Sequence, residues 1–322
     1  RSNLLRPAFL RMLRDIVRFN RQASALATAS VPGPAMSLGE FLDLHGYGDE
    51  FRHWYLLPMA ACIWSCPARQ MLAFPLATFI RFCHNHGLLQ VSDRPQWRTV
   101  RGGSRVYVEK LLAGIPQQRL ACPVLSVRRQ GHGGARMVEL HTAAGVEHAD
   151  HVVLACHSDQ SLALLADIRD DERSVLEAVR YQPNRAVLHT DASCLPQRRK
   201  AWSAWNYQGR ATEEGEAPQV CVHYLLNQLQ PLPFTTPVIV SLNPLDEPDP
   251  AKVIDEFSYA HPVFDGAAIA AQARLAGFQG AQHTWFAGAW TGYGFHEDGL
   301  KSGLAVAQVL NGMAAAELGH AA

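Results

Sequence analysis

Several features that identify common classes of protein are missing from this chain of 322 residues. Lysine plus arginine and aspartate plus glutamate each number 29, so no net charge favours nucleic acid or acidic lipid as a partner. The longest apolar run, residues 54–64, is about half as long as a membrane-spanning helix requires. We therefore expect no nucleic-acid partner and no transmembrane segment.

Disulfide, hydrolase, nucleotide-loop and metal patterns are missing too. The seven cysteines lack the spacing of a disulfide framework, which favours a reducing, cytoplasmic location. Neither G-x-S-x-G nor G-x4-G-K-[ST] occurs, so no serine-hydrolase elbow and no P-loop is expected. His84 and His86 could suggest a metal, but side chains two apart on a helix point in nearly opposite directions. No metal site is predicted.

Helical periodicity dominates the first part of the chain. Helices are expected over about 6–27, 37–45, 49–62 and 75–86. Ser37-x-x-Glu40 is a capping-box signature at the start of the second of these. Arginine is dense within residues 1–21, and we expect a solvated helix face there rather than a binding patch.

The middle of the chain mixes strands and helices. Residues 99–165 predict a helix over 107–114, a small meander from the β-rich runs 123–129, 136–141 and 151–156, and a helix over 158–166. Residues 167–280 predict helices at 172–180 and 267–275 around an antiparallel sheet, with 210–218 as the one possible linker. Its strands are expected at 186–190, 201–206, 219–226 and 238–242.

The most informative segment is Trp285–Gly303, WFAGAWTGYGFHEDGLKSG. It predicts a strand end, a glycine-lined turn and the first turns of a helix. Such a junction brings backbone N–H groups and the positive end of a helix dipole against an anionic or electron-rich ligand. A plain turn is the alternative.

The sequence of this segment resembles the C-terminal FAD-binding segment of the flavin-containing amine oxidase and phytoene-desaturase superfamily. The resemblance rests on "FAG", then an acidic residue, glycine and "xxSG", and it implies FAD as the cofactor. Gly288 and Ala289 would lie at the pyrophosphate, and Asp298, Gly299 and Leu300 at the flavin edge. The N–H groups of Gly299 and Leu300 would stabilise negative charge on the reduced flavin.

Other sequence segments extend the resemblance over nearly all of residues 1–312. There the chain most resembles a bacterial group of predicted NAD/FAD-binding, amine-oxidase-like proteins. Val124 matches the strand that meets the adenine, with a core valine as the alternative. Ala155, in HVVLACHSDQ, ends the strand that runs under the FAD, or only completes the core. The family's lysine near flavin N5 has no counterpart in residues 181–185, which puts oxidase reactivity with oxygen in doubt.

Aromatic residues supply candidates for a substrate pocket. Trp205 and Tyr224 could form an aromatic wall over a flavin or simply one face of a sheet. Where amine oxidases carry an aromatic cage residue this chain has His296, which weakens the interpretation as an amine cage. Trp290 and Tyr293 are the nearby alternatives.

The resemblance implies an α/β (mixed α+β) fold of two interleaved domains. An incomplete Rossmann-like FAD-binding domain is expected from 99–165 and 281–322, and a helix-plus-antiparallel-sheet substrate domain from 1–98 and 166–280. G-x-G-x-x-G, which binds the FAD diphosphate, is missing. We therefore expect a C-terminal piece of a longer flavoprotein, or a separate chain that supplies the Rossmann half.

The expected function is that of an FAD-dependent oxidoreductase. A hydride would pass from an apolar, possibly lipid-related substrate to flavin N5, with the cofactor supplying the redox chemistry. The alternative is a non-enzymatic binding or scaffold fragment that cannot hold FAD alone. Catalytic residues, substrate, electron acceptor and oligomeric state do not follow from the sequence.

Overall fold

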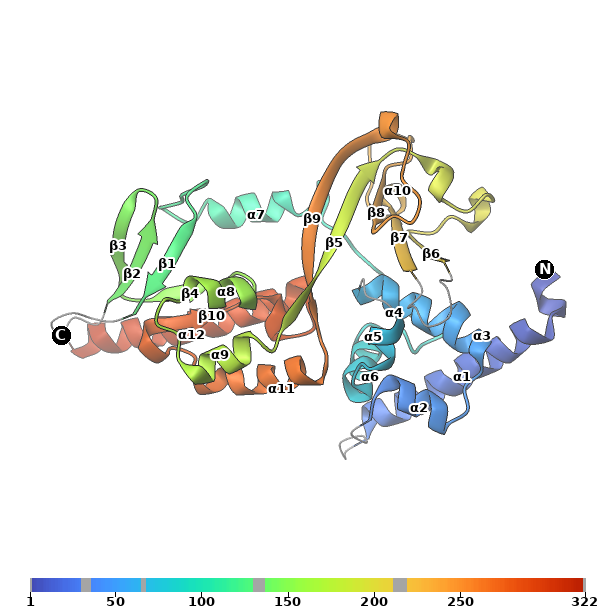
Figure 1. The fold of residues 1–322 in the computed structure, drawn as a ribbon, viewed down its shortest axis with the longest axis horizontal. Helices are drawn as coiled ribbons and strands as arrows, with labels where there is room; N and C mark the ends of the chain where they lie inside the picture. The colour runs from blue at the N-terminus through green and yellow to red at the C-terminus, as the bar shows by residue number, and fades with distance from the viewer. Residues whose placement is uncertain (1, 30–35, 65–67, 130–136, 211–218, 321–322) are drawn as a thin grey trace. The chain divides into compact units, whose positions relative to one another are not determined.

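The computed structural model describes all residues except 1, 30–35, 65–67, 130–136, 211–218 and 321–322 (Figure 1). The chain divides into two compact units, each built from two stretches of sequence. Unit 1 contains residues 1–116 and 182–261, and unit 2 contains residues 117–181 and 262–322.

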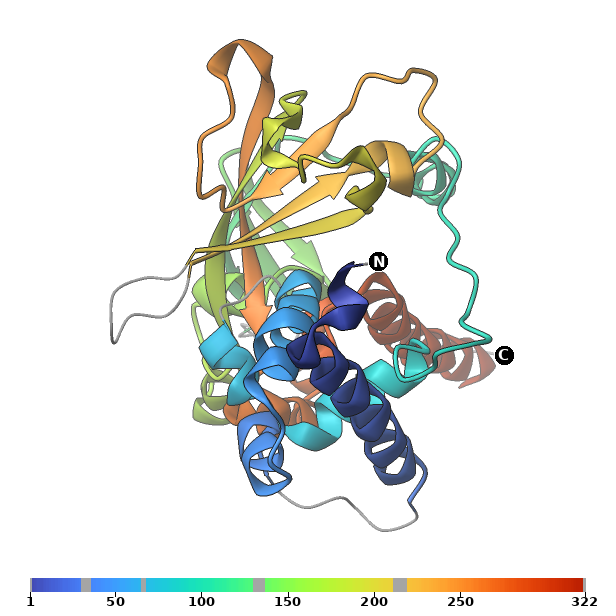
Figure 2. The same ribbon diagram turned by 90° about the vertical axis from the view of Figure 1, so that its right-hand side faces the viewer.

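The first stretch of unit 1 is helical, and Figure 2 shows its long first helix in dark blue beside the lighter blue helices. The elements are η1 (Ser2–Leu5), α1 (Pro7–Thr28), α2 (Leu38–Leu44), α3 (Asp49–Phe51), the π-helical η2 (Arg52–Leu56), α4 (Leu57–Trp64), α5 (Ala68–Leu72), α6 (Leu76–Asn85) and α7 (Arg105–Leu112). Phe19 of α1 is 1% exposed and packs against four aromatic rings of neighbouring segments. The capping box is confirmed, since Ser37 Oγ accepts from Glu40 N–H and the Glu40 carboxylate accepts from Ser37 N–H.

The second stretch of unit 1 forms a five-stranded sheet in the order β6-β7-β8-β5-β9. Its elements are β5 (Arg180–His189), η3 (Ala192–Cys194), η4 (Arg199–Ala201), β6 (Trp205–Arg210), β7 (Gln219–Leu225), α10 (Leu226–Leu229), β8 (Ile239–Leu242), η5 (Pro250–Lys252) and β9 (Val253–Val263). Leu225 and Ile239 pack with Leu195 from the segment after β5. Strands β5 and β9 both contain a boundary between the units.

A chain of buried neutral hydrogen bonds crosses this sheet. The Asp191 N–H donates to His189 Nδ1 (3.1 Å), so the proton of this imidazole is on Nε2. Nε2 therefore donates to Ser241 Oγ (2.6 Å), which lies 2.7 Å from His223 Nδ1. Both histidines and the serine are at most 1% exposed. The backbone amide of Asp191 therefore fixes the tautomer of His189.

The same chain continues from His223 to the surface. His223 Nε2 donates to Gln208 Oε1 (2.9 Å), and Gln208 Nε2 donates to Asp246 Oδ2 (3.0 Å). Burial and the neighbouring His189 lower the pKa of His223 to about 4, and burial lowers that of His189. The network is complete only while both imidazoles are neutral.

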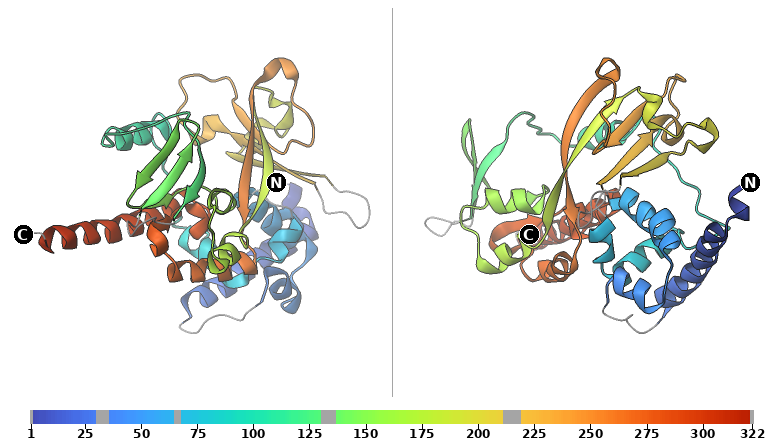
Figure 3. Two further views of the ribbon diagram at one scale, coloured as in Figure 1. Left: turned by 60° about the vertical axis from the view of Figure 1, so that its left-hand side comes forward. Right: turned by 45° about the vertical axis from the view of Figure 1, so that its right-hand side comes forward.

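Unit 2 holds a three-stranded meander, drawn in green in the left panel of Figure 3, and a two-stranded parallel sheet. Its elements are β1 (Val124–Arg128), β2 (Val138–Thr142), β3 (Gly145–Ala149), β4 (Val152–Leu154), α8 (Ser158–Leu164), α9 (Asp170–Leu176), α11 (Gly266–Arg274), η6 (Leu275–Gly277), η7 (Ala281–His283), β10 (Thr284–Phe286), η8 (Ala289–Thr291) and α12 (His296–His320). Its core combines Leu154 of β4 and Phe286 of β10 with apolar residues of α9 and α11.

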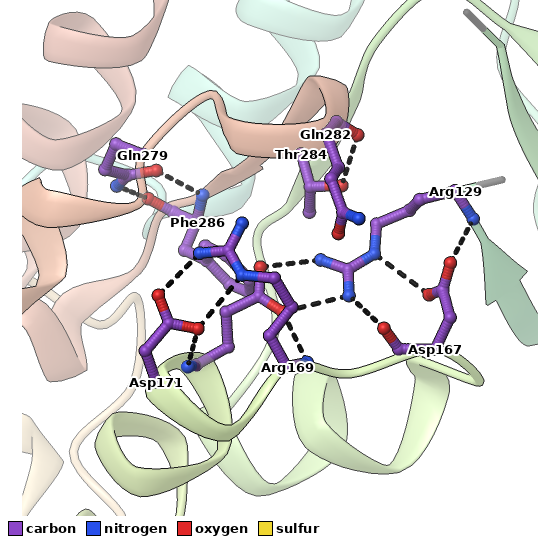
Figure 4. Close-up of polar contacts among 9 residues, drawn as sticks. Arg129, Asp167, Arg169, Asp171, Gln279, Gln282, Thr284 and Phe286 are labelled. Carbon is purple, nitrogen blue, oxygen red and sulfur yellow. Dashed lines mark hydrogen bonds and ion pairs between the residues drawn. The ribbon is translucent and has the colours of Figure 1, made fainter. Parts of the chain in front are cut away.

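A buried ion cluster joins β1 to α9 in unit 2 (Figure 4). The Arg129 guanidinium, 0% exposed, donates to both carboxylate oxygens of Glu172 (2.6 and 2.9 Å) and to Asp167 Oδ1 (2.9 Å). Burial opposes the charge on Arg129, but the hydrogen bonds to Glu172 and Asp167 outweigh it and raise its pKa. Every charge in the cluster has a direct partner.

The structure departs from the expected elements in several places, and the strand expected at 201–206 is β6 over 205–210. The third meander strand is Gly145–Ala149, expected as a turn, whereas the run at 151–156 forms β4, which pairs with β10. β9 was not expected, because its first seven residues are all exposed and show no alternation. The expected helix at 172–180 ends at Leu176, and β5 begins at Arg180. Residues 211–218 of the expected linker fall outside the described residues.

The unit boundaries also differ from the expected domain ranges. Residues 99–116 group with unit 1, and residues 166–181 and 262–280 group with unit 2. The latter follow from packing, since α9 and α11 contribute Leu176 and Ala271 to the core around β4 and β10. The roles of the two units as cofactor and substrate domains stay a prediction.

Candidate functional site: the ends of two parallel strands

The carboxyl ends of β4 and β10 meet at one edge of unit 2. Leu154 pairs with Phe286, and Ala287 N–H donates to the Leu154 carbonyl (3.0 Å), so Ala155 and Gly288 both follow the same edge. Ligands of open α/β sheets bind beyond the carboxyl ends of the strands. The structure thus brings together two of the segments that the resemblance placed near FAD.

Helix α8 follows β4, and its N-terminus is closed by the chain itself. Ser158 N–H donates to the Tyr181 hydroxyl (2.9 Å), and the Tyr181 ring stacks on His157 at 4.4 Å. Burial raises the Tyr181 pKa, so this hydroxyl stays protonated at neutral pH. Of the two helices that follow the parallel strands, α12 is therefore the better candidate for a ligand-binding helix.

Three glycines before α12 are required by the packing of the chain itself. Gly288 has φ +148°, and a Cβ there would lie 2.8 Å from Trp290 Cδ1. A Cβ on Gly292 would lie 2.6 Å from Asp298 Oδ1, and Gly294 has φ +91°. These positions demand glycine whether or not a ligand binds.

The backbone amides in the first turn of α12 have different hydrogen-bond partners from those expected. Phe295 N–H donates to Asp298 Oδ2 (3.0 Å), as in half of a capping box, so the Asp298 carboxylate is engaged within the turn. Gly299 N–H donates to the Phe295 carbonyl (3.2 Å). The N–H role expected of Gly299 is therefore wrong.

Gly299 still differs from the other glycines of the turn. A Cβ there would meet only Ala289 N, at an ordinary 3.7 Å, and a Cβ on Gly303, one turn further on the same face, would meet no atom within 4 Å. Glycine inside a helix costs about 1 kcal/mol relative to alanine. The first two turns of α12 thus present a bare face that internal packing does not explain, and this face fits the close approach of a flat group such as a flavin.

The strand end and the helix are tied together by one serine. Gly288 N–H donates to Ser302 Oγ (2.9 Å), and Ser302 Oγ donates to the Gly299 carbonyl (2.8 Å). The sequence contained this signal in "xxSG", but we had assigned Ser302 no role. This hydrogen bond uses the N–H of Gly288, and the positions expected for Gly288 and Ala289 at the pyrophosphate stay a prediction.

The remaining cofactor candidates differ in exposure. Val124, at the start of β1, is half-buried against the core of unit 2. Ala155 is exposed just after β4, and Leu300 is 56% exposed on α12. Ala155 and Leu300 are accessible to a ligand, whereas Val124 also serves the core.

The five pocket candidates fall into separate groups. Trp205 and Tyr224 are cross-strand neighbours in unit 1, with an edge-to-face ring contact at 6.0 Å. Trp290 is 3% exposed and donates to the Cys156 carbonyl (3.2 Å), so it anchors the core of unit 2. Tyr293 is half-buried and His296 exposed.

Comparison with known proteins identifies the fold. No protein-family model and no curated protein matches the chain. Among solved structures it is similar to a CLA-producing fatty acid isomerase from P. acnes (15% identity over 92% of this chain and 73% of that one, TM-score 0.59). It is also similar to cyclohexylamine oxidase from Brevibacterium oxydans IH-35A (11% identity, 95% and 76%, TM-score 0.60) and to putrescine oxidase bound to putrescine (13%, 93% and 76%, TM-score 0.62). The predicted mixed α/β class is confirmed, and the fold is the one found in these amine oxidases.

The residues that the structure describes contain neither a membrane-spanning helix nor a cluster of metal ligands. No helix there is long and apolar enough to cross a bilayer. No group of three or more His, Cys, Asp or Glu side chains in those ranges is arranged to hold a metal ion. The six cysteines they contain are free thiols.

Proposed function

We propose that the edge formed by β4, β10 and α12 is the flavin-edge half of an FAD site, and that the chain belongs to an FAD-dependent oxidoreductase. The bare face of α12 at Gly299 and Gly303 carries this proposal. The sequence resemblance to amine oxidases and the fold shared with two of them support it.

FAD, when bound, supplies the redox chemistry by accepting a hydride. The chain would supply position and charge. The positive end of α12 would stabilise negative charge on the cofactor. Ala289 would face the pyrophosphate, and Ala155 and Leu300 would contact the cofactor from either side.

We propose an apolar substrate, of the fatty-acid type. One structural neighbour is named a fatty acid isomerase, and the exposed Trp205 beside Tyr224 suits an acyl chain better than a small polar amine. A cytoplasmic location is part of the same proposal, since free thiols suit a reducing compartment.

The diphosphate half of the site would come from residues outside these 322 or from a separate chain. In the part of the chain that the structure describes, the open edge of the parallel sheet is beside β4. The outer edge of β10 is occupied, because Phe286 N–H donates to Gln279 Oε1 (2.8 Å) and the Phe286 carbonyl accepts from Gln279 Nε2 (2.7 Å). Within the described residues β4 pairs on one side only, and Val153 directs its backbone groups to the other.

The test is flavin retention in a pair of glycine variants. Gly299→Glu should lose bound FAD without unfolding, because a side chain there has room in the protein but would occupy the proposed flavin site. Gly312→Glu, later on the same helix and with no atom within 4 Å of its Cβ position, is the matched control. Flavin absorbance is measured with circular dichroism as the check on folding. Equal FAD content in both variants would falsify the placement of the site.

A binding or scaffold module is the second candidate, favoured by the missing G-x-G-x-x-G. It predicts a colourless protein that takes up no added FAD. A protein that turns yellow with FAD and keeps the colour through gel filtration excludes this candidate.

A further inference from the structure

Helix α1 has a second apolar stripe, on the face turned away from its neighbours. Leu10, Leu13 and Val17 are 50, 37 and 61% exposed, although their i, i+3, i+7 spacing is typical of a packed helix face. The face that does pack contains Met12 and Phe19, 9 and 1% exposed. The helix is therefore apolar on two sides, of which unit 1 buries one.

Arginines follow the exposed stripe along its length. Arg6, Arg14 and Arg21 are all exposed, at four before, four after and eleven after Leu10. At about 100° per residue these positions return to within about 40° of Leu10. The only acid of α1, Asp15, is 3% exposed on the packed side. Arg14 Nε lies 3.7 Å from the Asp15 carboxylate, so the basic character of this apolar face comes from Arg6 and Arg21 at its two ends.

Two further arginines of α1 contact the rest of unit 1 and do not belong to the exposed stripe. Arg11 forms an ion pair with Glu50, and the Arg18 guanidinium lies 4.1 Å above the Tyr47 ring. These contacts attach α1 to the rest of unit 1 and leave the face between Arg6 and Arg21 directed outward.

We propose that this face of α1 docks the protein on a lipid surface that carries anionic headgroups, with the helix lying in the plane of the interface. Such a surface offers apolar chains and negative charge side by side, which is what the stripe requires. Nucleic acid offers no apolar partner for three aliphatic side chains. A second copy of the stripe would place arginine against arginine. The proposal is independent of the proposed FAD site.

The test is co-sedimentation with vesicles of phosphatidylcholine containing phosphatidylglycerol, beside vesicles of phosphatidylcholine alone. The unmodified protein should bind the first in low salt, be released by high salt and ignore the second. Arg6→Gln/Arg21→Gln should weaken binding about 30-fold, since each arginine near an anionic surface contributes about a factor of five. Leu10→Gln/Val17→Gln should weaken it about tenfold or more.

The controls remove the same groups elsewhere in unit 1. Arg198→Gln/Lys200→Gln takes two exposed positive charges from η4 and its start, and Val108→Gln/Leu111→Gln takes two exposed apolar side chains from α7. Both should bind like the unmodified protein, and all variants should keep its circular dichroism spectrum. The proposal is overturned if no protein sediments with anionic vesicles, if neutral vesicles bind equally well, if the controls lose as much binding, or if the stripe instead causes concentration-dependent dimers without lipid.

Discussion

Each unit contains a buried polar network, and the two networks are built in opposite ways. Unit 2 buries full charges, with Arg129 held by Glu172 and Asp167, whereas unit 1 buries a neutral chain through His189, Ser241 and His223. The charged cluster depends on the presence of each partner, because a lone buried ion is costly. The neutral chain depends on protonation, because an extra proton would place two donors against each other. The difference predicts that mutation and acid act on different units.

Removal of Arg129 should have the largest effect. Arg129→Ala leaves the Glu172 carboxylate, 0% exposed, without its partner, and should lower the free energy of unfolding of unit 2 by about 3–5 kcal/mol. Urea unfolding measures this loss. The matched control is Arg128→Ala, one residue earlier and exposed, which should change little. A similar loss for both variants would show that the cluster has no special role.

Acid should act on unit 1 next. The pKa of His223 is lowered to about 4, so the unfolded chain, with an ordinary imidazole, binds the proton more tightly. The contribution is complete above about pH 6.5, declines as pH falls, and by pH 4 has cost about 3 kcal/mol. His189, with its pKa also lowered, adds in the same direction.

Urea midpoints between pH 7 and pH 4, followed in the unmodified protein and in two variants, measure this dependence. His223→Gln should flatten the profile, and His148→Gln, at an exposed histidine of unit 2, should leave it unchanged. A profile that is equally steep in His223→Gln would assign the acid sensitivity to other groups.

Ser241→Ala should have a smaller effect that acid does not explain. It leaves the donor at His189 Nε2 and the acceptor at His223 Nδ1 without their shared partner, which should cost about 2 kcal/mol. Thermal unfolding at pH 7 measures it, with Ser203→Ala at an exposed serine of the same unit as the control. No difference between the two would mean that the chain does not stabilise the sheet.

The smallest effect should come from the surface end of the neutral chain. Asp246→Asn keeps an oxygen for Gln208 and loses only an exposed ion pair with Arg210, so the change should be below about 1 kcal/mol. A loss as large as that of Ser241→Ala would mean that the chain depends on a charge after all.

Local signals predicted most of the elements but not these networks. Ser37 and Glu40 identified a helix start, and the glycines after Phe286 a strand-to-helix turn, because caps and turns act over a few residues. β9 was not predicted because its exposed residues show no alternation of buried and exposed positions. The pairing of His223 with Ser241 depends on strand register, which the sequence does not reveal.

The candidate site shows the same division. The segment, its helix and its glycines were predicted from the sequence. The amide of Gly299 was assigned wrongly because one residue decides whether an N–H lies before or inside the hydrogen-bonded helix. The bare face at Gly299 and Gly303 required coordinates, since only they show which glycines the packing already explains.

The amide of Gln279 has a consequence for assembly. It takes the positions at Phe286 that a further strand would need, so among the described residues the edge of this parallel sheet that stays open is the one at β4. Fibres that grow by edge pairing need two open edges on every subunit. Because a side chain closes one edge, only one further strand can be added at the open edge, and growth then stops. Gln279 thus allows this parallel sheet to be extended at one edge while it prevents growth by repeated edge pairing.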